Sequence, residues 1–165
     1  MSTEIEYRSG DATLPQASGP RIIAHVCNDA GGWGAGFVVA VSRRWRQPEA
    51  AYRAWHRDRA TSGFALGALQ LVRVEDELWV ANMVGQHGIR KRNRTSKASG
   101  DAPVRYEAID RALASLADEA VALRASVHMP RIGCGLAGGR WDVVEPLVTR
   151  NLTGRGVAVT VYDPV

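Results

Sequence analysis

The stretch Ile22–Phe37, which reads I-I-A-H-V-C-N-D-A-G-G-W-G-A-G-F, decides the fold. Its first part, Ile22–Val26, has the length and the branched apolar side chains of a buried strand. Glycines then alternate with Trp33 and Ala35 until a second apolar run begins at Phe37. This order predicts a strand, a glycine loop and a helix. Glycine loops and helix N-termini present backbone N–H groups to anions, so the stretch indicates either a phosphate site or a tight structural turn.

Length and composition indicate an ordinary soluble protein. The chain has 165 residues, 45% hydrophobic and 23% charged, so we expect a single domain spanning 1–165. No run is apolar and long enough to cross a membrane, and Met1–Gly10 lacks the apolar core of a secretion signal. The two cysteines, Cys27 and Cys134, could form at most one disulfide, so we expect a cytoplasmic protein. We also expect a monomer.

The net charge of +4 is unevenly distributed along the chain. The polar segment 90–100, which ends just before Asp101, contains no acidic residue. Its cationic residues are Arg90, Lys91, Arg92, Arg94 and Lys97. Such a concentration of positive charge predicts either contact with a polyanion such as nucleic acid or a solvated surface loop.

The whole chain alternates strands and helices. Strands are expected at 4–8, 22–26, 68–74, 78–84, 126–129 and 156–162. Helices are expected at 35–45, 48–59, 103–124 and 141–152. The segment 85–101 is expected to be a loop, and Pro146 should lie near the first turn of its helix. Because three residues separate strands 68–74 and 78–84, we expect an antiparallel hairpin there, and an α/β sandwich with a mixed sheet overall.

A second glycine loop follows the strand 126–129. Residues 130–139 read P-R-I-G-C-G-L-A-G-G. Since both glycine loops follow buried strands, we expect them at the same end of the sheet, where α/β proteins bind their ligands.

Three segments together resemble the macrodomain family, the ADP-ribose-binding fold, and the match spans nearly the full length. They are Gly10–Thr13 (G-D-A-T), Asn28–Phe37, and Met129–Leu136 (M-P-R-I-G-C-G-L). The resemblance implies a three-layer α/β/α architecture around a central mixed, mostly parallel six-stranded sheet. It also implies that ADP-ribose is the ligand and that no cofactor or metal is needed.

The resemblance assigns parts of the ligand to parts of the chain. The Asp11 carboxylate is expected to accept a hydrogen bond from the adenine amino group. Tyr162 could stack on adenine, or it could make only a hydrophobic edge contact within the protein. The second glycine loop is expected to wrap the diphosphate, and Asn28 to face the distal ribose. The implied ligand-binding residues are Asp11, Ala12, Asn28, Gly31, Gly32, Trp33, Gly34, Ala35, Gly36, Phe37, Arg131, Ile132, Gly133, Cys134, Gly135, Leu136, Ala137 and Tyr162.

Two subgroups of the family are similar to this chain. Its second loop and the G-W-G-A-G at Gly32–Gly36 resemble the glycohydrolase that removes terminal ADP-ribose from glutamate. The spacing from Asn28 to Gly36 resembles the antitoxin macrodomains that remove ADP-ribose from thymidine in DNA. The glutamate-directed enzyme has a lysine after the hairpin and an aspartate after G-C-G-L. Here Ala137 occupies the second position, and Lys91 and Lys97 are the lysines that follow the hairpin.

Cleavage at the ribose passes through an oxocarbenium-like state and needs nearby charge and a positioned water. We expect Asn28 to hold the ribose, Gln86 or His87 to lie nearby, and the substrate's own diphosphate to orient the water. Histidine suits proton transfer near neutral pH. The predicted function is therefore an ADP-ribosyl hydrolase acting on modified protein, at glutamate or aspartate, or on thymidine in DNA. The alternatives are a reader that binds ADP-ribose without hydrolysing it, and an ADP-ribose 1″-phosphate phosphatase.

Several residues in these motifs also have a structural interpretation. His25 and His128 lie in predicted central strands and are expected to be hydrogen-bonded core residues. Cys27 and Cys134 are expected to be small buried fillers rather than nucleophiles. Trp33 either covers the ligand or packs in the core, and Asp29 is either a second acid or a cap of the turn.

Overall fold

The computed structural model describes residues 4–89 and 102–165, and a single sheet runs through them. Its strands are β1 (Glu6–Ser9), β2 (Arg21–Asn28), β3 (Leu69–Glu75), β4 (Leu78–Gln86), β5 (Ser126–Met129) and β6 (Val159–Asp163). They lie in the order β1-β6-β5-β2-β4-β3. Every neighbouring pair is parallel except the β3–β4 hairpin, so the expected mixed, mostly parallel six-stranded sheet is confirmed.

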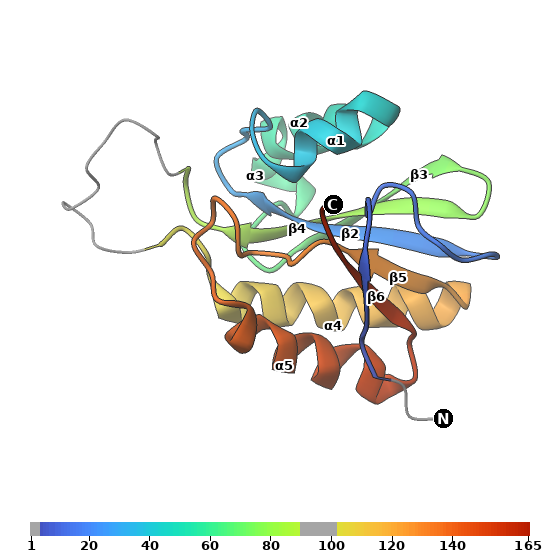
Figure 1. Cartoon of the computed structure of the whole chain (residues 1–165). Helices are drawn as coiled ribbons and strands as arrows, with labels where there is room; N and C mark the ends of the chain where they lie inside the picture. Colours follow the sequence, from blue (N-terminus) through green and yellow to red (C-terminus); the bar gives the residue numbers. More distant parts are fainter. Residues whose placement is uncertain (1–3, 90–101) are drawn as a thin grey trace.

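Helices cover both faces of this sheet. One face carries α1 (Phe37–Arg44), α2 (Gln47–Arg57) and α3 (Arg59–Ser62); the other carries α4 (Tyr106–Leu123) and α5 (Trp141–Asn151). Figure 1 shows the first group above the sheet and the second group below it. Two separate apolar clusters fill the two interfaces. The three-layer α/β/α architecture is therefore confirmed.

The local sequence explains the central elements. In β2, Ile22, Ile23 and Ala24 are fully buried, as a parallel strand covered on both faces requires. In α4, the stripe of Ile109, Leu113, Leu116 and Ala120 is buried against the sheet, as its spacing predicts. These two elements place the carboxyl ends of β2 and β5 beside the glycine loops.

Some boundaries differ from the sequence prediction. Gly85 and Gln86 belong to β4 rather than to a loop, because Gln86 pairs with Asn28 after a register shift that leaves Gly85 as the extra residue on β4, and because Gln86 bridges to Val104. The helix expected at 48–59 divides into α2 and α3 at Asp58. Pro146 lies inside α5, in its second turn rather than its first. Strand β6 begins at Val159, later than expected, because the Gly156 and Val157 N–H groups still donate back to the short 3-10 helix η2 (Thr153–Arg155) and to Leu152 before it.

Two expectations depend on residues beyond the described ranges. The cationic residues at positions 90–97 and most of the loop expected at 85–101 lie outside the described residues. Within the described part of the chain, no helix has the length and apolarity that a membrane crossing requires.

Candidate functional site

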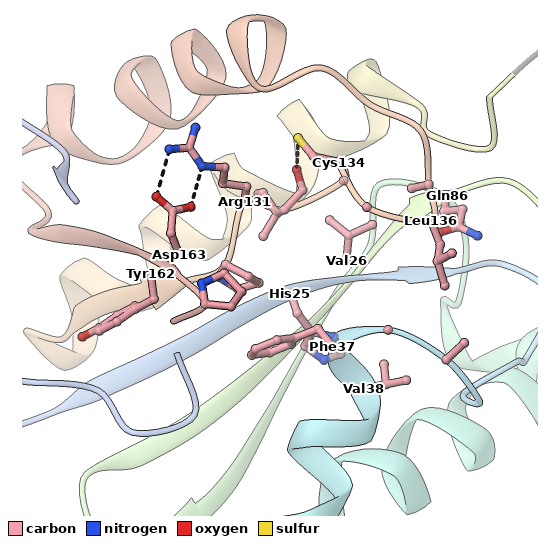
Figure 2. Close-up of a pocket in the computed structure, with 18 residues that line it drawn as sticks. His25, Val26, Phe37, Val38, Gln86, Arg131, Cys134, Leu136, Tyr162 and Asp163 are labelled. Atoms are coloured by element: carbon pink, nitrogen blue, oxygen red, sulfur yellow. Dashed lines mark hydrogen bonds and ion pairs between the residues drawn. The ribbon is translucent and has the colours of Figure 1, made fainter. Parts of the chain in front are cut away.

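A cleft of about 430 Å³ opens at the carboxyl ends of the parallel strands. Strands β2, β4 and β6 and both glycine loops contribute to it. Its lining residues are His25, Val26, Ala35, Gly36, Phe37, Val38, Gln86, Pro130, Arg131, Ile132, Gly133, Cys134, Gly135, Leu136, Ala137, Tyr162, Asp163 and Pro164. Figure 2 shows Tyr162 and Asp163 towards one end of the cleft and Gln86 and Leu136 towards the other.

One wall of the cleft is the N-terminus of α1. Gly36 precedes the helix with a φ of 85° and a ψ of −149°, a backbone conformation that is essentially restricted to glycine. Among residues 4–89 and 102–165, no side chain caps this end of the helix. The first N–H groups of a helix have no partners within it and form the positive end of its dipole. This wall of the cleft therefore favours an anion.

The opposite wall is the loop that follows β5. It folds back on itself, because the Gly139 N–H donates to the Gly133 carbonyl at 2.8 Å and the Gly138 N–H donates to the Gly135 carbonyl at 3.1 Å. A Cβ at Gly139 would overlap the Gly133 oxygen, so this fold of the loop requires glycine there. Leu136 Cδ1 lies 3.7 Å from the position of a Cβ at Gly36. The two glycine loops therefore approach each other across the cleft.

Arg131 is held rigidly at the edge of the cleft. Its Nε and Nη2 atoms donate to the two carboxylate oxygens of Asp163 at 2.6 and 3.0 Å (Figure 2). Its guanidinium carbon also lies 5.3 Å from the ring centroid of Tyr7 and 5.5 Å from that of Trp141. The hydrogen bonds from Arg131 lower the pKa of Asp163. The pair is therefore ionised, and its charges compensate each other.

The sequence prediction did not include Asp163 among the site residues. Its position at the carboxyl end of the last strand was a signal that could have been used. His25, Val26, Val38, Pro130 and Pro164 also line the cleft without having been predicted to do so.

His25 and His128 are buried core residues, and His25 also lines the cleft. The His25 Nε2 atom is 2.6 Å from the Asn82 Oδ1 atom, and the His128 Nδ1 atom is 2.8 Å from the Tyr162 hydroxyl oxygen. Both rings are buried, and burial lowers their pKa values to about 4; nearby Arg21 and Arg8 add to the effect at His128. The prediction that these are hydrogen-bonded core residues is confirmed.

Tyr162 lines the cleft but has little exposed surface. It is 2% exposed, and its hydroxyl accepts a hydrogen bond from the Gln16 N–H at 2.8 Å. The ring is thereby fixed at the wall of the cleft. Its contact with adenine stays a prediction.

The predicted adenine-binding turn lies outside the lining of the cleft. The Asp11 Oδ1 atom accepts hydrogen bonds from the Thr13 N–H at 2.8 Å and hydroxyl at 2.7 Å, and its Oδ2 atom accepts one from Arg44 at 3.3 Å. Burial would raise the pKa of Asp11, but these hydrogen bonds lower it. Ala12 is buried. The Asp11 carboxylate therefore already has protein partners.

Asn28 organises the first glycine loop. Its Oδ1 atom accepts hydrogen bonds from the N–H groups of Ala30 at 2.9 Å and Gly32 at 3.0 Å, and from the Tyr52 hydroxyl at 2.9 Å. Its Nδ2 atom donates to the Gly32 carbonyl at 2.8 Å. Asn28, Gly31, Gly32, Trp33 and Gly34 are not lining residues of the cleft, and contact between Asn28 and a ribose stays a prediction.

Trp33 packs in the core. Its indole N–H donates to the Ser42 hydroxyl at 2.7 Å, and its ring lies 5.4 Å from the rings of both Tyr52 and His25. Of the two interpretations that the sequence left open, the structure shows packing.

Cys27 is the small buried residue that the sequence suggested, whereas Cys134 lines the cleft. Cys27 is buried and Cys134 is half-buried, and both are free thiols. Burial raises the pKa of each thiol, which disfavours the nucleophilic thiolate.

Three polar residues gather where β2 and β4 end. Gln86 lines the cleft and donates from Nε2 to the Gly88 carbonyl at 2.9 Å. The His87 Nδ1 atom is 2.7 Å from the Asp29 Oδ2 atom, and the Gly88 N–H donates to the Asp29 Oδ1 atom at 2.8 Å. His87 and Asp29 are not lining residues, but each directly follows a residue of the Gln86–Asn28 pair that joins the two strands. The sequence prediction had not paired Asp29 with His87.

Three further features bear on other kinds of chemistry: metal ligands, position 137 and the lysines after the hairpin. Among residues 4–89 and 102–165, no group of three or more His, Cys, Asp or Glu side chains is arranged to hold a metal ion. Ala137 is buried, and its carbonyl accepts a hydrogen bond from the Val104 N–H at 3.0 Å. Lys91 and Lys97 lie outside the described residues.

No family model matches the chain, but it is similar to several solved structures. It is 61% identical to a macrodomain protein from Streptomyces coelicolor, with a TM-score of 0.85 over 97% of this chain and 99% of that one. It is 49% identical to a protein of unknown function from Bacteroides thetaiotaomicron, with a TM-score of 0.92 over the whole of both chains.

More distant similarities cover parts of larger proteins. The chain is 32% identical, over 98% of its length, to mouse (Mus musculus) chromodomain-helicase-DNA-binding protein 1-like, and spans 18% of that protein. Thermosipho africanus DarTG in complex with ADP-ribose is 19% identical, with a TM-score of 0.62 over 87% of this chain and 38% of that one. At that identity the likeness shows the fold alone.

Proposed function

This chain belongs to the macrodomain family, and on that premise we propose that its cleft binds ADP-ribose and that the protein is an ADP-ribosyl hydrolase. One observation carries the binding proposal: the uncapped N-terminus of α1 and the glycine loop after β5 face each other in one cleft of about 430 Å³. That volume suits a small-molecule ligand. The DarTG structure, of which 38% has this fold, is a complex with ADP-ribose.

The two glycine loops suggest the orientation of the ligand. The diphosphate lies between Gly36 at the start of α1 and Gly135 in the second loop, where N–H groups and the helix dipole favour its charge. The adenosine extends towards Tyr162, and the distal ribose extends towards Gln86, at the opposite end of the cleft.

The ribose end of the cleft supports hydrolysis by water. Gln86 lines this end of the cleft and pairs with Asn28, and His87 directly follows Gln86 in the chain. From these positions Gln86 can orient a water molecule near the ribose and His87 can accept its proton. The leaving group is a protein glutamate or aspartate carboxylate, or thymidine in DNA. A buried alanine at position 137 leaves no carboxylate there, so the proposed water-activating residues are Gln86 and His87.

The same alanine favours the alternative of a reader that binds ADP-ribose without hydrolysing it. Calorimetry with free ADP-ribose tests binding, and no heat of binding would contradict both proposals. Incubation with glutamate-ADP-ribosylated protein and with thymidine-ADP-ribosylated DNA then separates the two. Release of ADP-ribose identifies a hydrolase and its linkage, whereas binding without release identifies a reader. Release of inorganic phosphate from ADP-ribose 1″-phosphate would instead identify the phosphatase.

A further inference from the structure

Asp29 and His87 connect the loops that follow two neighbouring central strands. The Asp29 Oδ2 atom is 2.7 Å from His87 Nδ1, and Asp29 Oδ1 accepts the Gly88 N–H at 2.8 Å. The Asp29 N–H also donates to the Gln86 carbonyl at 2.9 Å. Three hydrogen bonds thus fix these residues to each other, although Asp29 and His87 are 58 positions apart in the sequence.

This contact determines which nitrogen of His87 carries the proton. Burial would raise the pKa of Asp29, but hydrogen bonds from Gly88 and His87 lower it, so the carboxylate is ionised near neutral pH. An ionised carboxylate can only accept hydrogen bonds, and His87 Nδ1 must therefore be the donor. In the neutral ring, Nε2 then carries the lone pair.

The exposed fractions of Asp29 and His87 suit an orienting role for Asp29 and a role as a base for His87. The Asp29 side chain is 20% exposed, whereas the His87 side chain is 62% exposed. A shielded carboxylate that orients an accessible imidazole is the arrangement that general-base catalysis uses. Two other polar groups contact the Asp29 loop: the Tyr52 hydroxyl donates to the Asn28 carbonyl at 2.6 Å, and Arg53 donates to the Gly31 carbonyl at 3.2 Å.

We infer that Asp29 is a positioning residue that holds His87 as the general base at the ribose end of the cleft; this inference rests on the proposed hydrolase function. For a glutamate ester, the water oxygen forms a bond to C1″ of the distal ribose while Nε2 of His87 accepts a proton from that water. The bond from C1″ to the ester oxygen breaks, and its electron pair leaves with the carboxylate. The products are ADP-ribose and the free carboxylate. The imidazolium, stabilised by Asp29, then releases its proton to solvent.

The first test observes the tautomer directly and needs no substrate. Histidine labelled with ¹⁵N is observed by long-range ¹H–¹⁵N NMR at about pH 8.5, well above the usual imidazole pKa. His87, assigned through His87→Gln, should carry its proton on Nδ1. In Asp29→Asn, the amide can donate to Nδ1 while its oxygen still accepts the Gly88 N–H, so the proton should move to Nε2. The His25 and His128 signals serve as internal references. A tautomer that is the same in both proteins would overturn the positioning role.

The second test measures turnover of the substrate that the wild-type protein hydrolyses. Asp29→Asn should lower kcat by about 100-fold, within the range for loss of a general base, and change the ADP-ribose Kd by less than about threefold. Asp76→Asn, at a fully exposed position in the β3–β4 turn, is the matched control and should keep wild-type kcat. Wild-type-like kcat in Asp29→Asn would overturn the positioning role alone. Absence of turnover in the wild-type protein would instead overturn the hydrolase proposal.

Discussion

Arg131 and Asp163 form a two-point ion pair at one end of the cleft, with Nε–Oδ1 and Nη2–Oδ2 distances of 2.6 and 3.0 Å. Both residues line the cleft, and Arg131 is also held beside the rings of Tyr7 and Trp141. The positive charge of Arg131 is therefore available only in part to an anionic ligand.

Substitutions in this pair should affect ADP-ribose binding with opposite signs. Asp163→Asn leaves Arg131 beside its two aromatic rings with an uncompensated positive charge, so the Kd for ADP-ribose should fall by about twofold to fivefold at low salt. Arg131→Ala leaves an uncompensated carboxylate at the cleft, and the Kd should rise by at least about threefold. Calorimetry at two salt concentrations measures both. Changes of the same sign in the two variants would contradict this electrostatic account.

A charge introduced at Gly135 should block the diphosphate. A Cβ at Gly135 would have no heavy atom of the described residues within 4 Å, so these residues leave room for a side chain at this position. Gly135→Glu places a negative charge in the loop proposed to bind the diphosphate, and should weaken ADP-ribose binding by at least about tenfold relative to Gly135→Gln. The glutamine variant has nearly the same size and no charge. Equal Kd values for the two variants would place the diphosphate elsewhere.

Asn28 can affect ADP-ribose binding by shaping the first glycine loop, by contacting the ribose, or by both. Tyr52→Phe removes the hydroxyl that bonds to Asn28 but leaves the amide in place, whereas Asn28→Ala removes the amide itself. We expect Asn28→Ala to weaken ADP-ribose binding at least about threefold more than Tyr52→Phe does, because the amide retains donor capacity beyond its bond to Gly32. Equal losses in calorimetry would indicate that Asn28 acts only by shaping the loop.

The two buried histidines should make stability fall in acid. The pKa values of His25 and His128 in the folded state are about 4, against about 6.5 for an unfolded chain. Between these values the unfolded chain binds more protons, so the free energy of unfolding decreases as the pH falls. From pH 7 to pH 4.5 we expect a loss of roughly 2 kcal/mol per histidine in urea unfolding.

A comparison of two proteins isolates this contribution, because carboxylates with lowered pKa values change stability in the same direction. The loss of unfolding free energy between the two pH values should be smaller in His128→Gln than in the wild-type protein. If the two proteins lose the same amount, His128 does not contribute to the pH dependence.

Much of the fold could be predicted from local patterns. The apolar run of β2 and the stripe of α4 are repeated over several residues, and burial follows that periodicity directly. Boundaries were less predictable where distant residues decide them. Gln86 belongs to β4 because it pairs with Asn28 and bridges to Val104, and neither contact leaves a trace in the sequence near position 86.

The candidate site, like the fold, could be predicted from the sequence only in part. By itself the sequence determined that two glycine loops follow buried strands and that the chain resembles the macrodomains, because glycine spacing and strand hydrophobicity are local properties. Only the tertiary structure decided that Asp29 faces His87, that Asp163 compensates the charge of Arg131, and that Asn28 shapes its own loop. The first two contacts join residues 58 and 32 positions apart. In a parallel sheet such residues meet only after the strands have paired, so their partners follow from strand order and not from neighbouring residues.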